Sequence, residues 1–193
     1  MTPTLLVIIG STRPTRVGSA VGQWFVDHAR TDGRFTTEVA DLAEMALPLL
    51  DEPDHPRVRQ YRHPHTQAWS KRVETADAVV FITPEYNYGV SAPLKNAIDY
   101  LHHEWQIKPA AFVSYGGVSG GTRAVQMLKQ IVTTVKMVPL CEAVVIPWVE
   151  QFLDDDKHFC ATPALEEAAS VMLNELLFWA KGLKAMRDQR AAL

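Results

Sequence analysis

Apolar residues along this chain fall into two patterns. Short continuous apolar runs are typical of strands in a parallel sheet, because both faces of such a sheet are covered. Five runs of this kind follow one another, and the third is expected to stop at Pro84. They predict strands in TLLVIIG (4–10), FTTEVADL (35–42), DAVVFITPEYN (77–87), AAFVSYGG (110–117) and EAVVIPWV (142–149).

Between these runs, apolar residues recur every three or four positions, which predicts amphipathic helices. Residues 47–65 are different, because they carry prolines at positions 48, 53, 56 and 64. Proline opposes both helix and central strand, so this segment is expected to be a loop. The predicted helices cover about 17–29, 66–76, 93–101, 125–135 and 165–183.

Strands and helices therefore alternate along the whole chain. This alternation predicts right-handed crossovers and an α/β fold, a three-layer α/β/α sandwich around a parallel sheet. Five strands suit the flavodoxin-like order 2-1-3-4-5. The sequence shows no internal repeat and no shift in composition, so residues 1–193 are expected to form one domain.

Composition excludes several classes of protein. The chain has 193 residues, of which 47% are hydrophobic and 21% charged, which argues against disorder. A net charge of -3 without a basic run argues against a nucleic-acid partner. The apolar runs are too short for a membrane span, and the N-terminus lacks the pattern of a signal peptide. Cys141 and Cys160 fit no zinc or CxxC spacing, and we expect two unpaired thiols in a cytoplasmic protein.

Clusters of potential metal ligands are interpreted as surface features. The histidines of HPH (63–65) and HH (102–103) have no cysteine or paired carboxylate at ligand spacing. The run DDD (154–156) lacks the alternating ligands and the distal glutamate of a calcium loop. We therefore expect no metal site.

Three unusual loops follow the first, third and fourth predicted strands. They read GSTRPTRVGS (10–19), TPEYNYGVSAP (83–93) and SYGGVSGGTR (114–123). In the order 2-1-3-4-5, ligands bind beyond the carboxyl ends of the strands, at the point between strands 1 and 3 where the winding reverses. The topology therefore brings the three loops to one site.

The first loop is rich in groups that donate hydrogen bonds. It leads into a helix N-terminus, where free N–H groups and the helix dipole attract anions. Ser11 and Ser19 add hydroxyl donors, and Arg13 adds a guanidinium cation that can bind an anion through two N–H groups. The expected ligand is therefore a phosphate monoester. The alternative is that the hydroxyls only cap the helix while the arginines are solvated. The loop has neither the Walker spacing nor GxGxxG, and no cysteine precedes the arginines as in a cysteine-dependent phosphatase.

The other two loops suit a flat ligand. Residues 84–89 carry aromatic and amide groups that match a heteroaromatic ring with polar edges, although the tyrosines could instead pack against a neighbouring subunit. Residues 116–121 contain four glycines, which let the backbone come close to a planar ligand. The alternative for this segment is a simple strand-to-helix turn.

In their order and spacing, GSTRPTRVGSAV, TPEYNYGVSAPLKNAIDYL and SYGGVSGGTRAVQML resemble the NADPH-dependent FMN reductases, a flavodoxin-like group that includes quinone, chromate and azo-dye reductases. The resemblance implies FMN as cofactor, NADPH or NADH as co-substrate, and a homodimer or homotetramer. Tyr88, Trp105 and the helix after Pro93 would then lie at the subunit interface. The FMN-binding residues that it implies are Ser11, Arg13, Val17, Gly18 and Ser19 for the phosphate, and Pro84, Glu85, Tyr86, Asn87, Ser114, Gly116 and Gly117 for the ring.

The resemblance implies an oxidoreductase that passes electrons from a nicotinamide, through FMN, to a small-molecule acceptor such as a quinone, an azo dye or a flavin, with ping-pong kinetics. No side chain is assigned a catalytic role, since the flavin supplies the chemistry. The Gly116 and Gly117 amides and the following helix N-terminus are expected to stabilise negative charge on the reduced ring. The alternatives are a flavodoxin-type electron carrier and, without any positive feature, a non-catalytic nucleotide-binding regulator.

Overall fold

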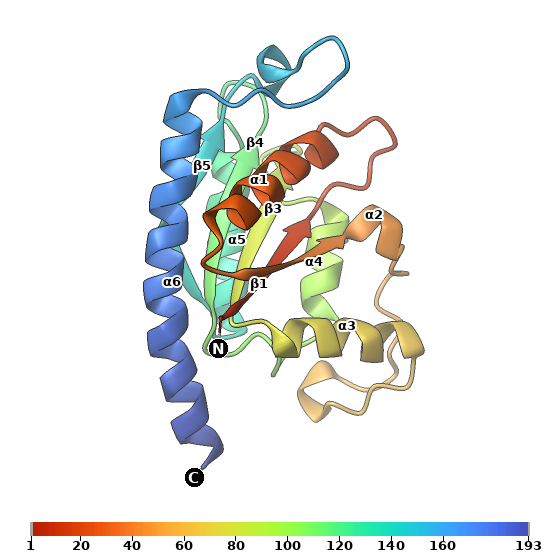
Figure 1. The fold of residues 1–193 in the computed structure, drawn as a ribbon. Coiled ribbons are helices and arrows are strands. Elements are labelled where there is room, and N and C mark those ends of the chain that lie inside the picture. Colours follow the sequence, from red (N-terminus) through yellow and green to blue (C-terminus); the bar gives the residue numbers. More distant parts are fainter. Residues whose placement is uncertain (1, 193) are drawn as a thin grey trace.

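The computed structural model describes residues 2–192 and shows a five-stranded parallel sheet between two layers of helices (Figure 1). The order across the sheet is β2-β1-β3-β4-β5, and every neighbouring pair is parallel. This result confirms the predicted flavodoxin-like sheet. The strands are β1 (Thr4–Ile9), β2 (Thr36–Asp41), β3 (Ala78–Pro84), β4 (Pro109–Tyr115) and β5 (Val138–Ile146).

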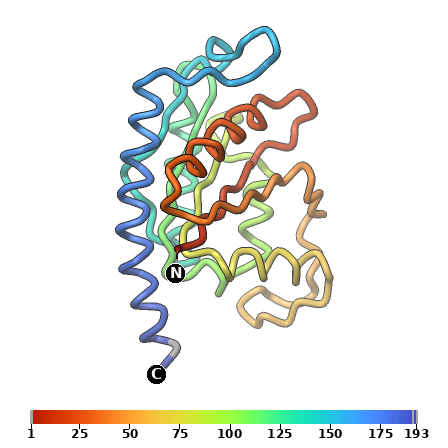
Figure 2. Tube along the Cα trace, in the orientation of Figure 1, coloured from red at the N-terminus to blue at the C-terminus, as the bar shows by residue number. Residues whose placement is uncertain are grey.

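Helices cover both faces of the sheet. One face packs against α1 (Gly18–Asp32) and α6 (Pro163–Ala191), and the other packs against α3 (Pro64–Thr75), α4 (Ala92–Asp99) and α5 (Thr122–Thr134). Short elements complete the chain: α2 (Leu42–Met45) and the 3₁₀ helices η1 (Pro56–Val58) and η2 (Val149–Phe152). Figure 2 shows α6 running along the outside of the molecule to the C-terminus.

The predicted strands and helices all exist, but some boundaries were wrong. β5 begins at Val138 rather than Glu142, because Pro139 hid its start and an edge strand tolerates proline. α6 continues to Ala191, well beyond the expected end at Leu183, since no proline interrupts it after Pro163. The proline-rich loop contains η1, in which Pro56 occupies the first turn.

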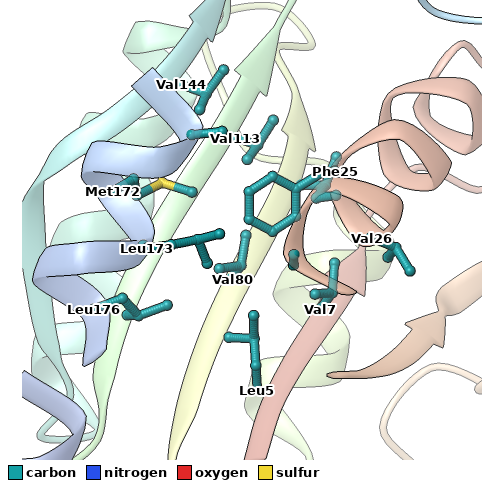
Figure 3. Close-up of a cluster of buried hydrophobic side chains, with 14 of the residues drawn as sticks. Leu5, Val7, Phe25, Val26, Val80, Val113, Val144, Met172, Leu173 and Leu176 are labelled. Atoms are coloured by element: carbon teal, nitrogen blue, oxygen red, sulfur yellow. The ribbon is translucent and has the colours of Figure 1, made fainter. Parts of the chain in front are cut away.

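Side chains of β1 alternate between two separate cores. Leu5, Val7 and Ile9 face α1 and α6, whereas Leu6 and Ile8 face the opposite helices. This alternation explains why the strand reads as an unbroken apolar run. In Figure 3, side chains from α1 and α6, among them Phe25 and Leu173, converge on the sheet over Val80.

Buried aromatic rings fill the second core. The Trp69 and Trp105 rings lie 5.9 Å apart edge to face, and both indole N–H groups donate to carbonyls near the end of α4, Trp69 to Ala97 and Trp105 to Ile98. Trp105 has no exposed surface. Its expected role in a subunit interface is therefore wrong, because its apolar body completes the core of its own chain.

A lysine is buried where β4 begins, at the opposite end of the sheet from the carboxyl edge. Lys108 Nζ donates to the carbonyl oxygens of Val73 and Glu74 at the end of α3, the latter at 2.9 Å. Burial, with Arg187 nearby, lowers the pKa of Lys108 to about 7, and Asp77, Glu74 and Glu104 oppose the shift. The amine caps the last carbonyls of α3 in either protonation state.

This lysine makes the free energy of unfolding depend on pH. The pKa of Lys108 is about 7 in the folded chain, whereas the reference pKa of a lysine side chain is 10.5. Between these values the unfolded chain binds a proton that the folded chain lacks, so stability rises with pH across this window, with a slope of at most about 1.4 kcal/mol per pH unit. We expect Lys108→Met to remove that slope in urea unfolding measured at pH 7 to 10, whereas Lys71→Met, at an exposed site on α3, retains it. Equal slopes in wild type and Lys108→Met would contradict the assignment.

Candidate functional site

The loop between β1 and α1 forms one end of the site. α1 begins without a side-chain cap, so its first N–H groups remain available to a ligand. Ser11 is fully buried, and its hydroxyl lies 2.8 Å from the Tyr86 hydroxyl of the β3–α4 loop. Arg13 is exposed, and its guanidinium lies 3.5 Å from the Thr15 carbonyl oxygen, a marginal contact. These groups can receive an anion.

The second arginine of this loop has a structural task. Arg16 pairs with Asp41 at the end of β2, with Nη2 2.5 Å from Oδ2. Asp41 also accepts the Ala43 N–H at 3.0 Å and so caps α2. The Ser19 hydroxyl donates to the Arg16 carbonyl oxygen at 3.3 Å. Arg16 therefore anchors the loop to the neighbouring strand and is not the free cation of the site.

A tyrosine that the sequence analysis did not single out lies under the start of α1. Tyr115 is 5% exposed, and within residues 2–192 its hydroxyl has no hydrogen-bond partner. Burial raises the pKa of Tyr115 far above its ordinary value, so the phenol stays protonated. The nearby Ser11 side chain lowers this pKa, but its hydroxyl does not meet the geometry of a hydrogen bond to the phenol. A Cβ at Gly18 would lie 2.3 Å from the Tyr115 hydroxyl oxygen, so Gly18 leaves the space that the phenol occupies.

The β3–α4 loop closes with a tight hairpin. Tyr86 and Gly89 exchange two backbone hydrogen bonds, at 3.0 and 2.9 Å. The two residues between them, Asn87 and Tyr88, have φ angles of 50° and 70°, as a type I′ turn requires. Asparagine tolerates this conformation, but a tyrosine there is strained. The Arg123 guanidinium lies 4.0 Å from the centre of the Tyr88 ring and stabilises it.

Glu85 joins this loop to α5. Its carboxylate accepts the Arg123 backbone N–H at 3.0 Å and Arg123 Nη1 at 3.1 Å. The carboxylate thus caps the first turn of α5 and offsets its positive end. This finding contradicts the expectation that the α5 N-terminus is free to stabilise a negatively charged ring.

The four glycines after β4 have two different tasks. Gly120 and Gly121 have φ angles of 58° and 85°, and a Cβ at Gly121 would lie 2.8 Å from Ser114 Cβ, so the fold itself requires both. A Cβ at Gly117 would meet only the Trp148 ring, at 3.9 Å. The Gly116 N–H donates to the Ile146 carbonyl oxygen. The expectation that this amide would be free to bind a ligand is therefore wrong. Gly117 is dispensable to the fold and leaves space beside the sheet edge.

These loops enclose a cavity of about 400 Å³, a size typical of small-ligand sites. Eight of the twelve predicted residues line it. The other four surround it: Gly18 against the Tyr115 hydroxyl, exposed Ser19, Asn87 in the hairpin, and Ser114, which is fully buried behind Gly121. The cavity is lined by Ser11, Arg13, Val17, Pro84, Glu85, Tyr86, Tyr115, Gly116, Gly117, Trp148, Val149, Glu150 and Gln151.

A fourth segment of the site, after β5, was missed. The N–H groups of Trp148 and Val149 donate to the carbonyl oxygens of Gly117 and Gly116, at 3.0 and 3.2 Å. Trp148 has a φ angle of 49° and is 55% exposed at the mouth of the cavity. The sequence analysis placed Trp148 within the predicted strand 142–149, where an aromatic residue cannot be distinguished from a core residue.

The clusters HPH (63–65), HH (102–103) and DDD (154–156) do not line the cavity. Within residues 2–192, no group of three or more histidine, cysteine or acidic side chains could hold a metal ion. His65 instead pairs with Asp51 at 3.0 Å and stacks on His63. Cys141 and Cys160 are both exposed free thiols. None of the helices described is long and apolar enough to cross a bilayer.

The chain is similar to known flavin-dependent reductases. A sequence profile described as NADPH-dependent FMN reductase matches residues 3–151. An NAD(P)H-dependent FMN reductase of Schizosaccharomyces pombe is 40% identical over 151 residues, which cover 76% of this chain and 75% of that protein. An NADPH:quinone oxidoreductase of Arabidopsis thaliana is 45% identical over 71 residues, 35% of this chain and 36% of that protein.

A solved structure shows the same fold. FerB of Paracoccus denitrificans, a flavoenzyme NAD(P)H:(acceptor) oxidoreductase, superposes with a TM-score of 0.72 at 23% identity, over 93% of this chain and 98% of its own. The profile covers more than half of the sequence, and the Schizosaccharomyces pombe protein is similar over three quarters of both chains. On these grounds the chain belongs to the NADPH-dependent FMN reductase family and is an oxidoreductase.

Proposed function

We propose that the protein holds FMN in the cavity at the carboxyl edge of the sheet and carries electrons from NADPH or NADH to a small acceptor such as a quinone, an azo dye or a free flavin. The observation that carries this proposal is the unpartnered Tyr115 hydroxyl beside the uncapped start of α1. A buried hydroxyl without a partner costs about 1–3 kcal/mol, and an anion at this helix end would relieve the cost.

The residues of the cavity fit a phosphorylated flavin. Tyr115, Arg13 and the first N–H groups of α1 would hold the phosphate, with Ser11 between them and Tyr86. The wall formed by Gly116 and Gly117 has no Cβ atoms, so a flat ring could lie against its backbone. Pro84 and Glu85 would lie along another edge of the ring, where Glu85 is already fixed by Arg123.

Bound FMN would supply the hydride acceptance and release of the reaction. The chain's own residues bind and orient it, and no side chain in the cavity has to act as a general acid or base. Tyr86, 41% exposed, and Trp148 border the open mouth, where a nicotinamide and then an acceptor could stack. One mouth used in turn by two substrates supports a ping-pong sequence. The free thiols fit a reducing compartment, so we also propose a cytoplasmic location.

Removing either hydrogen-bond donor to the phosphate should weaken the binding of FMN much more than the binding of riboflavin. Tyr115→Phe deletes only the hydroxyl, and Arg13→Ala deletes the cation. A charge-assisted hydrogen bond contributes about 1.5–3 kcal/mol, which predicts a ten- to hundredfold rise in the Kd for FMN, measured by quenching of flavin fluorescence. Riboflavin, which has no phosphate, is the matched ligand control. Equal losses for both flavins would show that these residues do not contact the phosphate.

A side chain at Gly117 should close the ring site without disturbing the fold. In Gly117→Val, the Cβ has room beside Trp148, and the added side chain would take up space in the cavity that Gly117 lines. We expect thermal unfolding near that of the wild type and at least a tenfold loss of affinity for both FMN and riboflavin. Gly121→Ala is the contrasting variant, since its Cβ would clash with Ser114, and it should lower Tm. Wild-type affinity in folded Gly117→Val would remove this residue from the ring site.

The reaction itself is tested with the FMN-loaded protein. Under anaerobic conditions, NADPH or NADH should bleach the visible flavin absorption, and adding a quinone should restore it. Steady-state double-reciprocal plots at several quinone concentrations should be parallel. If neither nicotinamide bleaches the flavin, the electron-carrier alternative is favoured. If FMN does not bind at micromolar concentration, the proposal fails.

A further inference from the structure

Trp148 has an unfavourable backbone conformation at the mouth of the cavity. Its φ and ψ angles are 49° and 47°, in the left-handed region that favours glycine and is strained for a bulky residue. Eight non-glycine residues between 2 and 192 have a positive φ angle, and Trp148 is the one among them that lines the cavity. Glycine or asparagine would serve the turn better. The chain therefore accepts strain in order to carry an indole at this position.

The backbone of Trp148 is fixed. Its N–H donates to the Gly117 carbonyl oxygen at 3.0 Å, and its own carbonyl oxygen accepts the Gln151 N–H at 2.9 Å. The residue is 55% exposed, and a Cβ at Gly117 would lie 3.9 Å from its ring. In Figure 1 the segment after β5 projects beyond the carboxyl edge of the sheet before the chain enters α6. The indole is thus held beside the Gly117 wall and partly in solvent.

The Trp148 side chain lacks the contacts that hold the tryptophans of the core. The indole N–H groups of Trp24, Trp69 and Trp105 donate to oxygen acceptors at 2.7, 2.8 and 3.1 Å. In the part of the chain that the structure describes, Trp148 has no such acceptor and no stacked aromatic neighbour. An indole that is held in place but has no partner is a surface on which a flat conjugated ring can stack.

We propose that Trp148 determines which substrates the mouth accepts, because its indole stacks on the nicotinamide ring and then on the planar ring of a quinone or flavin acceptor. This inference rests on the proposed function and assigns a substrate class to it. Both substrates are flat conjugated rings, so one indole serves each in turn. A stacked aromatic pair raises affinity about two- to tenfold, whereas a compact acceptor without a ring gains nothing from the indole.

Equilibrium binding tests the stacking without turnover. NADP⁺ is titrated by calorimetry into the oxidised, FMN-loaded protein, with which it cannot react. We expect Trp148→Ala to raise the Kd for NADP⁺ about two- to tenfold, and Trp148→Phe, which keeps an aromatic ring, to raise it less. Trp179→Ala removes another exposed indole, on α6, and should leave this Kd unchanged. Adenosine 2′,5′-bisphosphate, which lacks the nicotinamide, should bind Trp148→Ala and wild type equally.

Acceptor selectivity gives a second measurement. A naphthoquinone is a flat ring that takes two electrons and two protons, whereas ferricyanide is octahedral and takes one electron. At a saturating concentration of the nicotinamide, the KM for the naphthoquinone divided by the KM for ferricyanide should rise about two- to tenfold in Trp148→Ala. An unchanged ratio would contradict the stacking of the acceptor.

Relief of the strain separates substrate binding from folding. Glycine adopts a positive φ angle without strain, so Trp148→Gly should keep a stable fold and still lose affinity for NADP⁺ as Trp148→Ala does. Lys157→Gly is the matched variant, since Lys157 is exposed and has a φ angle of 66°, and it should not change the Kd. The two variants should have similar Tm. A Tm of Trp148→Gly clearly below that of Lys157→Gly would show that the indole serves the fold, and would overturn the proposal.

Failure of this inference and failure of the proposed function give different results. If FMN does not bind, or if neither nicotinamide bleaches it, the proposed function fails and this inference fails with it. If FMN binds and is bleached but Trp148→Ala binds NADP⁺ as tightly as the wild type, only the stacking role of Trp148 is overturned. A loss of FMN affinity in Trp148→Ala as large as the loss of NADP⁺ affinity would place the indole against the cofactor, which also overturns it.

Discussion

The carboxyl ends of parallel strands must all lie at one edge of the sheet, and every feature of the site depends on that constraint. Loops that are about 30 to 140 residues apart in sequence meet there because β1, β3, β4 and β5 end at the same level. β1 ends before Gly10 and Ser11, and β4 ends at Tyr115. Topology therefore assembles the cavity before any side chain acts.

The loops are fixed to one another as well as to the sheet. The hydroxyls of Ser11 and Tyr86 join the first loop to the second. Glu85 and Arg123 join the second to the third, and the N–H of Trp148 joins the fourth to Gly117. Each is a hydrogen bond between segments distant in sequence, and together they hold the cavity walls in place without a ligand. A site organised in this way loses less conformational entropy when it binds.

The fold and most of the residues that line the cavity could be predicted from the sequence, for identifiable reasons. The strict alternation of apolar runs with helical periodicity leaves few topologies possible, so the sheet order could be predicted. The loop residues stood out because a cluster of Gly, Ser and Arg directly after a buried strand is unlike the apolar composition of the core. Tyr115 and Trp148 did not stand out, since an aromatic residue at the end of a strand is indistinguishable in sequence from a core residue. Trp105 shows the reverse error, because its place in the core depends on partners such as Trp69 and Phe81.

Tyr115 also links the cofactor site to the stability of the fold. Its ring is part of the core between α1 and the sheet, while its hydroxyl is left without a partner. The protein without its cofactor therefore bears the cost of that group, of the strained Trp148 and of the uncapped start of α1. A ligand that satisfies the hydroxyl and the helix end binds the folded chain but not the unfolded one, and so it raises the free energy of unfolding with its concentration. The groups proposed to hold the phosphate are the same groups that leave the empty fold below its greatest stability.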